Sequence, residues 1–196
     1  MRSLQTLVAG LLILLFGPLG PAASQKAERR ISLVIGISAY STSPLQTPAN
    51  DAGLVAQTLQ AAGFDVVGAR DLDQDSLRRA FRDFHDKAAA SGPDSVAFIF
   101  LSGYGAQFEG ENYFIPVDAK IDQASDVPAQ AIRISDYLRP LQALKLKATI
   151  LVLDAARPNQ FAQSGPPLAG GLALPAVSSP GSVVMPRSPI RSTDSD

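Results

Sequence analysis

The feature that most constrains the fold is a run of six apolar residues, Val96 to Leu101, that ends at the tetrapeptide Ser102-Gly103-Tyr104-Gly105. A run of this length and composition predicts a strand buried on both faces, as in a parallel sheet. Two glycines around one large side chain predict a turn that lifts Tyr104 above the end of the strand. Because sites in open α/β sheets form at the carboxyl ends of strands, Tyr104 is a candidate site residue.

A second apolar run has the same form. It extends from Ala148 to Leu153 and ends at the segment 154–157, which reads Asp-Ala-Ala-Arg. If the two runs are parallel neighbours, Tyr104 and this segment lie at the same rim of the sheet. Ala156 follows Tyr104 by 52 positions (156 minus 104).

The rest of the pattern alternates between the two kinds of element. Apolar runs predict further strands at 31–37 and 64–67, and apolar residues at helical spacing predict helices near 52–62, 75–88 and 135–144. Glu109-Gly110 predicts the turn of a small hairpin, and Ser135 is a candidate cap for the last helix. This order predicts an α/β fold, with an open, mostly parallel sheet, helices on both faces and a small hairpin.

Composition excludes several kinds of chemistry. The chain has no cysteine and one histidine, which excludes a disulfide, a zinc-thiolate site, a thiol nucleophile and a histidine-rich metal site. We therefore expect no metal site and no cofactor. Charged residues make up 18% of the chain and the net charge is −1, which argues against a nucleic-acid partner.

Two features that look functional have plainer interpretations. The acidic stretch Asp71–Asp75 resembles the start of a calcium loop, but it lacks the glycine and the glutamate that such a loop needs. We expect it to cap a helix instead. His85 lies off the apolar stripe of that helix, so we expect it in solvent and not in a catalytic role.

The two ends of the sequence differ from its middle. Residues 1–24 read as a secretory signal, with Arg2 at the positive end, an apolar segment too short to span a bilayer, and small residues before Gln25. The expected protein is therefore exported, periplasmic or extracellular, with no stable membrane span after cleavage. Residues 162–196 are rich in Gly, Pro and Ser and predict a linker-like, disordered tail.

Six stretches resemble the catalytic domain of caspase-like cysteine peptidases, in the bacterial metacaspase-like branch. They occur in the family's order and place a caspase-like domain at 29–161. The stretches are Leu33–Tyr40, Pro48–Ala52, Gly63–Val66, Ser102–Gly105, Gly110–Asp118 and Leu153–Arg157.

The resemblance implies that both catalytic side chains are replaced. In the family a His stands between the two glycines of the first loop, and a Cys follows an Asp-Ala pair about 50 residues later. Here these positions are Tyr104 and Ala156. Alanine offers no nucleophile, and a phenol, with a usual pKa of about 10, is a poor general base near neutral pH. The expected protein is a pseudopeptidase.

The resemblance further implies that Asp51 and Asp154 line a pocket for a basic substrate side chain, so that a basic peptide or protein is the expected ligand. From the residues alone, the favoured interpretation is instead that Asp51 is a first-turn helix residue and Asp154 a strand-end turn residue. Arg157 could also pair with one of these acids and close the pocket.

Three functional hypotheses stay open. The first is the pseudopeptidase. The second is an active member of the peptidase family or an unorthodox hydrolase that uses Ser102 with Tyr104. Against it, no Ser or Thr between Leu151 and Gln163 replaces the thiol, and Ser102 lies on the other loop. The third is a truncated, inert product: the later strands of the family's sheet look missing, which would leave an open edge prone to self-association.

Overall fold

The computed structural model describes residues 28–157, 161, 172 and 182–186. The predicted signal, 1–24, and most of the predicted tail lie outside these described residues. None of the described helices is both long enough and apolar enough to cross a membrane.

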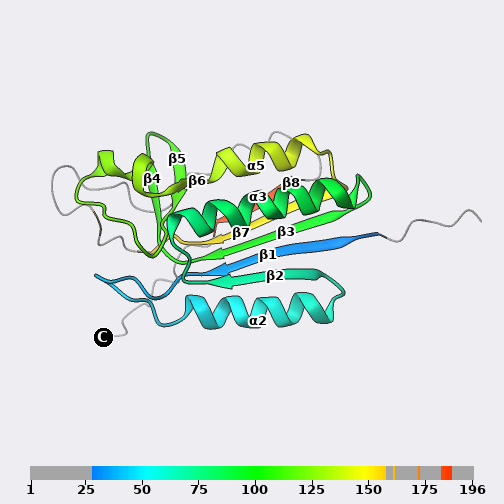
Figure 1. Cartoon of the computed structure of the whole chain (residues 1–196), viewed down its shortest axis with the longest axis horizontal. Helices are drawn as coiled ribbons and strands as arrows, with labels where there is room; N and C mark the ends of the chain where they lie inside the picture. The colour runs from blue at the N-terminus through cyan, green and yellow to red at the C-terminus, as the bar shows by residue number, and fades with distance from the viewer. Residues whose placement is uncertain (1–27, 158–160, 162–171, 173–181, 187–196) are drawn as a thin grey trace, which may run out of the picture.

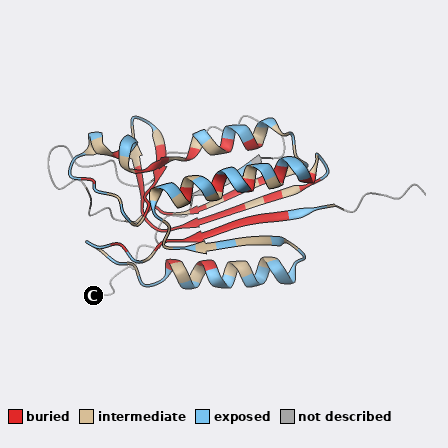
Figure 2. Ribbon diagram, in the orientation of Figure 1, coloured by how far each residue is buried: buried red, intermediate tan, exposed pale blue. Residues whose placement is uncertain are grey.

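Five parallel strands form the main sheet, in the order β2-β1-β3-β7-β8. Each of the predicted apolar runs forms one of its strands, so the open, mostly parallel sheet is confirmed. Figure 2 shows that β1 and β3 are buried along most of their length, whereas β2 at the edge is more exposed. The strands are β1 (Arg30–Gly36), β2 (Asp65–Arg70), β3 (Val96–Ser102), β7 (Ala148–Asp154) and β8 (Ser182–Pro186).

Helices cover both faces of this sheet (Figure 1). Helix α2 (Pro48–Ala61) lies on one face, and α3 (Gln74–Ser91) and α5 (Ile134–Ala143) lie on the other. Alternate strand residues point to opposite faces. Odd-numbered residues of β1 and β3 therefore enter the large core under α3 and α5, while even-numbered ones such as Val34 and Phe100 pack against α2.

A smaller antiparallel sheet follows β3 and stands beside its carboxyl end. It consists of β4 (Gly105–Phe108), β5 (Glu111–Phe114) and β6 (Ile132–Arg133), with η1 (Ala124–Asp126) and α4 (Val127–Gln130) before β6. Glu109 and Gly110 both have positive φ, 49° and 78°, as a two-residue type I′ hairpin turn requires. The predicted hairpin is confirmed.

The two predicted helix caps have different outcomes. Asp73 caps α3, because its carboxylate accepts a hydrogen bond of 2.8 Å from the Ser76 amide. The prediction for Ser135 is wrong. Helix α5 begins one residue earlier, and the Ser135 hydroxyl donates to the Glu111 carboxylate at 2.7 Å. Ser135 thus ties α5 to β5 instead of satisfying the free amides of its own helix.

The segment predicted as a tail contributes a strand. Residues 182–186 form β8, which pairs in parallel with β7 in register from Thr149–Ser182 to Leu153–Pro186. The open edge of the sheet on this side is therefore β8 and not β7, because β8 satisfies the outward backbone groups of β7. The sequence hides β8 because a short strand in a Pro-, Gly- and Ser-rich segment has no alternating pattern of its own.

Candidate active site at the carboxyl ends of β3 and β7

The two predicted site loops lie side by side. β3 and β7 are parallel neighbours whose last residues, Ser102 and Asp154, pair directly. Beyond them the Gly105 amide donates to the Ala155 carbonyl at 2.9 Å, and the Gly103 amide donates to the Asp154 carbonyl at 3.3 Å. Strand pairing thus continues into the loops and holds Tyr104 and Ala156 at one rim. The catalytic ancestry of these two positions stays a prediction.

The two glycines permit this close approach. A Cβ on Gly105 would lie 2.9 Å from the Ala155 carbonyl oxygen, and one on Gly103 would lie 2.7 Å from the Tyr40 hydroxyl. Neither glycine has a positive φ, so space and not backbone conformation requires them. The sequence predicted a turn that lifts the tyrosine clear of the sheet. Instead the side chain of Tyr104 is 3% exposed.

An aromatic cluster buries Tyr104. Its ring packs edge-on against Tyr40, with centroids 4.8 Å apart, and against Phe161, with centroids 5.3 Å apart. The Tyr40 hydroxyl accepts a hydrogen bond from the Tyr104 amide at 3.0 Å and donates to the Ile115 carbonyl at 2.9 Å. Burial raises the pKa of Tyr40 well above its usual range, so this hydroxyl keeps its proton.

The acidic residue at the end of β7 already has a basic partner. The Asp154 carboxylate accepts hydrogen bonds from the Ser102 hydroxyl at 3.1 Å and from the Arg157 guanidinium at 3.2 Å. The side chains of Asp154 and Arg157 are 14% and 24% exposed. The Nε atom of Arg157 is buried and has no partner among the described residues. Arg157 therefore already pairs with the carboxylate that was predicted to bind a basic ligand.

The second predicted acid, Asp51, lies in the first turn of α2 and is half-buried. Helix α2 starts at the same end of the sheet as the rim (Figure 1). Asp154 continues the even-numbered side of β7, which faces α2, so both acids belong to the same side of the sheet. No described hydrogen bond or ion pair joins Asp51 to the Asp154 group, and their shared pocket stays a prediction.

The rim offers little for covalent chemistry. Ala156, 9% exposed, carries only a methyl group. The hydroxyl of Ser102, two residues before Tyr104, is fully buried and donates a hydrogen bond to Asp154. Within the described part of the chain no cluster of three or more His, Cys, Asp or Glu side chains could hold a metal ion.

Two residues of this rim, Tyr40 and Phe161, were not predicted as site residues. Tyr40 follows the carboxyl end of β1, so the rule that assigned Tyr104 to the rim could have assigned Tyr40 as well. Phe161 had no such signal, because it comes seven residues after Asp154, the last residue of β7, which is too far along the chain for the rule to apply. Only the fold shows that both rings meet Tyr104.

Comparison with known proteins agrees with the fold. A search among curated proteins finds no significant match. Among solved structures, a protein of Geobacter sulfurreducens matches with a TM-score of 0.51 at 16% identity, over 65% of this chain and 50% of that one. The Drosophila initiator caspase Dronc matches with a TM-score of 0.50 at 14% identity, over 71% of this chain and 51% of that one.

These structural likenesses show the fold alone, and the chain spans about half the length of either relative. The family model described as a caspase domain goes further, because it matches residues 29–187. This match includes the rim, the hairpin and β8. Since it covers most of the sequence, the chain belongs to the caspase-domain family.

Proposed function

We propose that this caspase-domain chain is a pseudopeptidase, which keeps the scaffold of the family and does not hydrolyse peptide bonds. The observation that carries the proposal is the pair of side chains at the rim, a buried phenol at Tyr104 and a methyl group at Ala156. The family resemblance aligns them with the His and the Cys. A cysteine-peptidase mechanism needs a thiolate to attack the carbonyl and an imidazole to move protons, and neither group is available.

The surroundings of Ser102 favour this proposal over an unorthodox serine hydrolase. A nucleophilic hydroxyl must reach the substrate carbonyl, and Ser102 is fully buried. Its proton points to Asp154, whose carboxylate also holds Arg157. This arrangement is that of a structural hydrogen bond at the end of two paired strands.

Peptide hydrolysis tests the loss of catalysis. The purified chain is incubated with fluorogenic peptides that carry Arg or Lys before the reporter group, beside the Tyr104→Phe variant. We expect no release of the fluorophore above the buffer rate for either protein. Activity that co-purifies with the wild-type chain and disappears in Tyr104→Phe would overturn the proposal, whereas activity equal in both proteins identifies a contaminating peptidase.

We further propose that the former substrate cleft binds a basic side chain of a partner at Asp154. The support is the internal pair itself, because the Asp154 carboxylate already accepts a guanidinium, that of Arg157, at 3.2 Å. A ligand arginine would offer the same charge-assisted hydrogen bonds and would have to displace Arg157. Asp51, on the same side of the sheet, would add a second negative charge.

Peptide binding tests this second step. An arginine-containing peptide is compared with the same peptide carrying neutral citrulline, by isothermal titration calorimetry. We expect Arg157→Ala to tighten binding of the arginine peptide and Asp154→Asn to abolish it, with a smaller loss in Asp51→Asn. Arg139→Ala is the matched control, because Arg139 is exposed and pairs with Glu111. Equal binding of the citrulline peptide, or no effect of Arg157→Ala, would contradict the assignment.

A further inference from the structure

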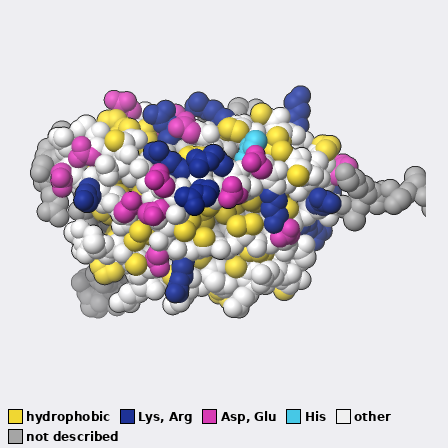
Figure 3. Space-filling model, viewed as in Figure 1, with side chains coloured by type: hydrophobic (Ala, Val, Ile, Leu, Met, Phe, Trp, Pro, Cys, Tyr) yellow, Lys and Arg dark blue, Asp and Glu magenta, His cyan; other side chains and the backbone are white. Residues whose placement is uncertain are grey.

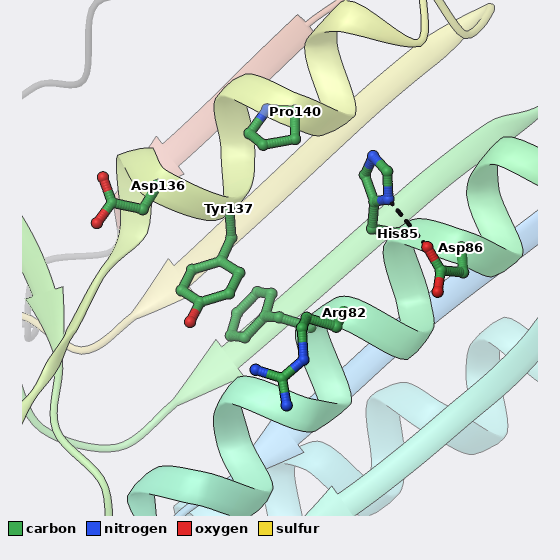
Figure 4. Close-up of a pocket in the computed structure, with 7 residues that line it drawn as sticks. Arg82, His85, Asp86, Asp136, Tyr137 and Pro140 are labelled. Atoms are coloured by element: carbon green, nitrogen blue, oxygen red, sulfur yellow. Dashed lines mark hydrogen bonds and ion pairs between the residues drawn. The ribbon is translucent and has the colours of Figure 1, made fainter.

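A hollow of about 350 Å³ lies between α3 and α5. Figure 4 shows that it is lined from both helices, with His85 and Arg82 on α3 and Tyr137 and Pro140 on α5. Helix α3 starts near the rim, and His85 lies about three turns further along it. The hollow is therefore separate from the Tyr104–Ala156 rim, and nothing proposed above uses it.

The floor of the hollow is aromatic. The rings of Phe81 and Tyr137 are stacked, with centroids 4.7 Å apart and planes tilted by 32°. Pro140 continues this surface along α5. Proline has no amide hydrogen to donate inside the helix, but its ring is a flat apolar surface. Such a floor suits a planar ring, and the volume lies at the small end of ligand pockets.

Cationic groups border the floor. Arg82 is exposed, and no described residue accepts a hydrogen bond from its guanidinium or forms an ion pair with it. Burial raises the pKa of Tyr137, the positive charges of Arg78 and Arg82 oppose that rise, and the negative charge of Asp136 adds to it, so two guanidinium groups and one carboxylate act on its hydroxyl. Figure 3 shows Lys and Arg side chains over this face, interspersed with Asp and Glu side chains, and the single histidine at their border.

Two acidic side chains also border the hollow, those of Asp86 and Asp136, and both are exposed. The Asp86 carboxylate is 3.3 Å from Nδ1 of His85, and this contact leaves Nε2 of the ring without a described partner. The Asp136 carboxylate points away from both His85 and Arg82 in Figure 4. The sequence placed His85 in solvent, but the ring is only 35% exposed, because α5 packs beside α3.

We propose that the hollow between α3 and α5 binds a small aromatic carboxylate. The ring of the ligand lies on the floor formed by Phe81, Tyr137 and Pro140. Its carboxylate pairs with the Arg82 guanidinium, and the His85 ring forms the opposite wall with Nε2 available for a hydrogen bond. Arg82 is the group that favours an anion, because no described residue pairs with its charge, whereas the Asp86 carboxylate contacts His85 and the Asp136 carboxylate points away from Arg82.

Phenylacetate is the probe, and the one histidine of the chain is the reporter. The imidazole carbon–proton signal of His85 is followed by NMR during titration, beside phenylacetamide, which has the same ring and no charge, and benzylamine, which is cationic. We expect a saturable shift with phenylacetate, with a dissociation constant of about 1 mM or tighter, and binding of phenylacetamide at least about fivefold weaker.

Variants separate a built site from general attraction to a basic surface. Arg82→Gln should weaken phenylacetate binding at least about fivefold, whereas Arg79→Gln, an exposed arginine of the same helix outside the hollow, should leave it within about twofold. Both side chains are exposed, so neither change threatens the fold. Absence of saturation up to about 20 mM, equal losses in the two variants, or tighter binding of benzylamine would overturn the proposal.

Discussion

Tyr40→Phe tests the importance of the aromatic cluster for the fold. The substitution removes a single oxygen, and this oxygen joins two backbone groups that are far apart in the sequence, the Tyr104 amide and the Ile115 carbonyl. Tyr40 itself is 3% exposed, so water does not easily replace the lost hydroxyl. The ring remains in place, and the packing against Tyr104 and Phe161 is retained.

The expected loss of stability follows from these two bonds. Each buried polar group left without a partner costs about 1–3 kcal/mol, and two groups lose theirs, so Tyr40→Phe should lower the free energy of unfolding by about 2–6 kcal/mol. The pH dependence adds a second signature. The pKa of Tyr40 is raised in the folded chain, so its stabilising contribution is complete below the unfolded pKa of about 10 and decreases as the pH rises above it. At pH 11 the wild-type advantage should be smaller by about 1.4 kcal/mol.

Urea denaturation followed by circular dichroism at pH 7 and at pH 11 measures both effects. Tyr113→Phe is the control, because Tyr113 is also buried but its hydroxyl accepts a hydrogen bond from Arg133, whose guanidinium reaches water. We expect it to cost less than about 1 kcal/mol. A Tyr40→Phe loss no greater than that of the control would refute the reasoning. Absence of any cooperative transition in the wild-type chain would instead favour the inert product.

Three further predictions follow from the fold. Gly105→Ala should destabilise the chain by about 1–3 kcal/mol in the same urea assay, because its Cβ would meet the Ala155 carbonyl at 2.9 Å, whereas Gly53→Ala, with open space around the new Cβ, should not destabilise it. Asp73→Ala should lower the thermal midpoint of unfolding, and the decrease should be smaller in acid. The carboxylate that caps α3 has a lowered pKa, so its stabilising contribution is present above its ordinary pKa and is lost as the pH falls. A chain ending at residue 181 lacks β8 and exposes the edge of β7, so light scattering should detect association that the full chain does not show.

The sequence predicts the main sheet well because buried parallel strands are continuous apolar runs. Val96–Leu101 and Ala148–Leu153 stand out against their flanks, and both lie within a residue of the strands observed. The hairpin was equally clear, since Glu109-Gly110 supplies the two positive φ values that its turn needs. The helix cap predicted at Ser135 was wrong, because a hydroxyl near the start of a helix can form its hydrogen bond either with its own helix or with a neighbouring strand.

The sequence predicted where the site lies in the fold, but not how its side chains are arranged. The ends of two parallel strands had to meet, so Tyr104 and Ala156 could be assigned to one rim from their runs alone. The direction of the Tyr104 side chain could not, because it depends on Tyr40 and Phe161, which come from segments without a periodic signal. The internal pair of Asp154 with Arg157 was anticipated only as an alternative.

The burial of Tyr104 bears on what the proposed loss of catalysis would mean for the rest of the domain. A general base must face its substrate, whereas a phenol that is 3% exposed between two other rings is part of the core. Under the proposal, a position that serves chemistry in the family serves stability here, since an aromatic ring in such a cluster contributes through its buried area and its edge-on contacts. The Tyr40 hydroxyl also accepts a hydrogen bond from the Tyr104 amide, which holds the backbone at this position. A return to an imidazole at this position would place a polar ring where the surroundings provide aromatic faces, so two substitutions alone would not rebuild a working cleft.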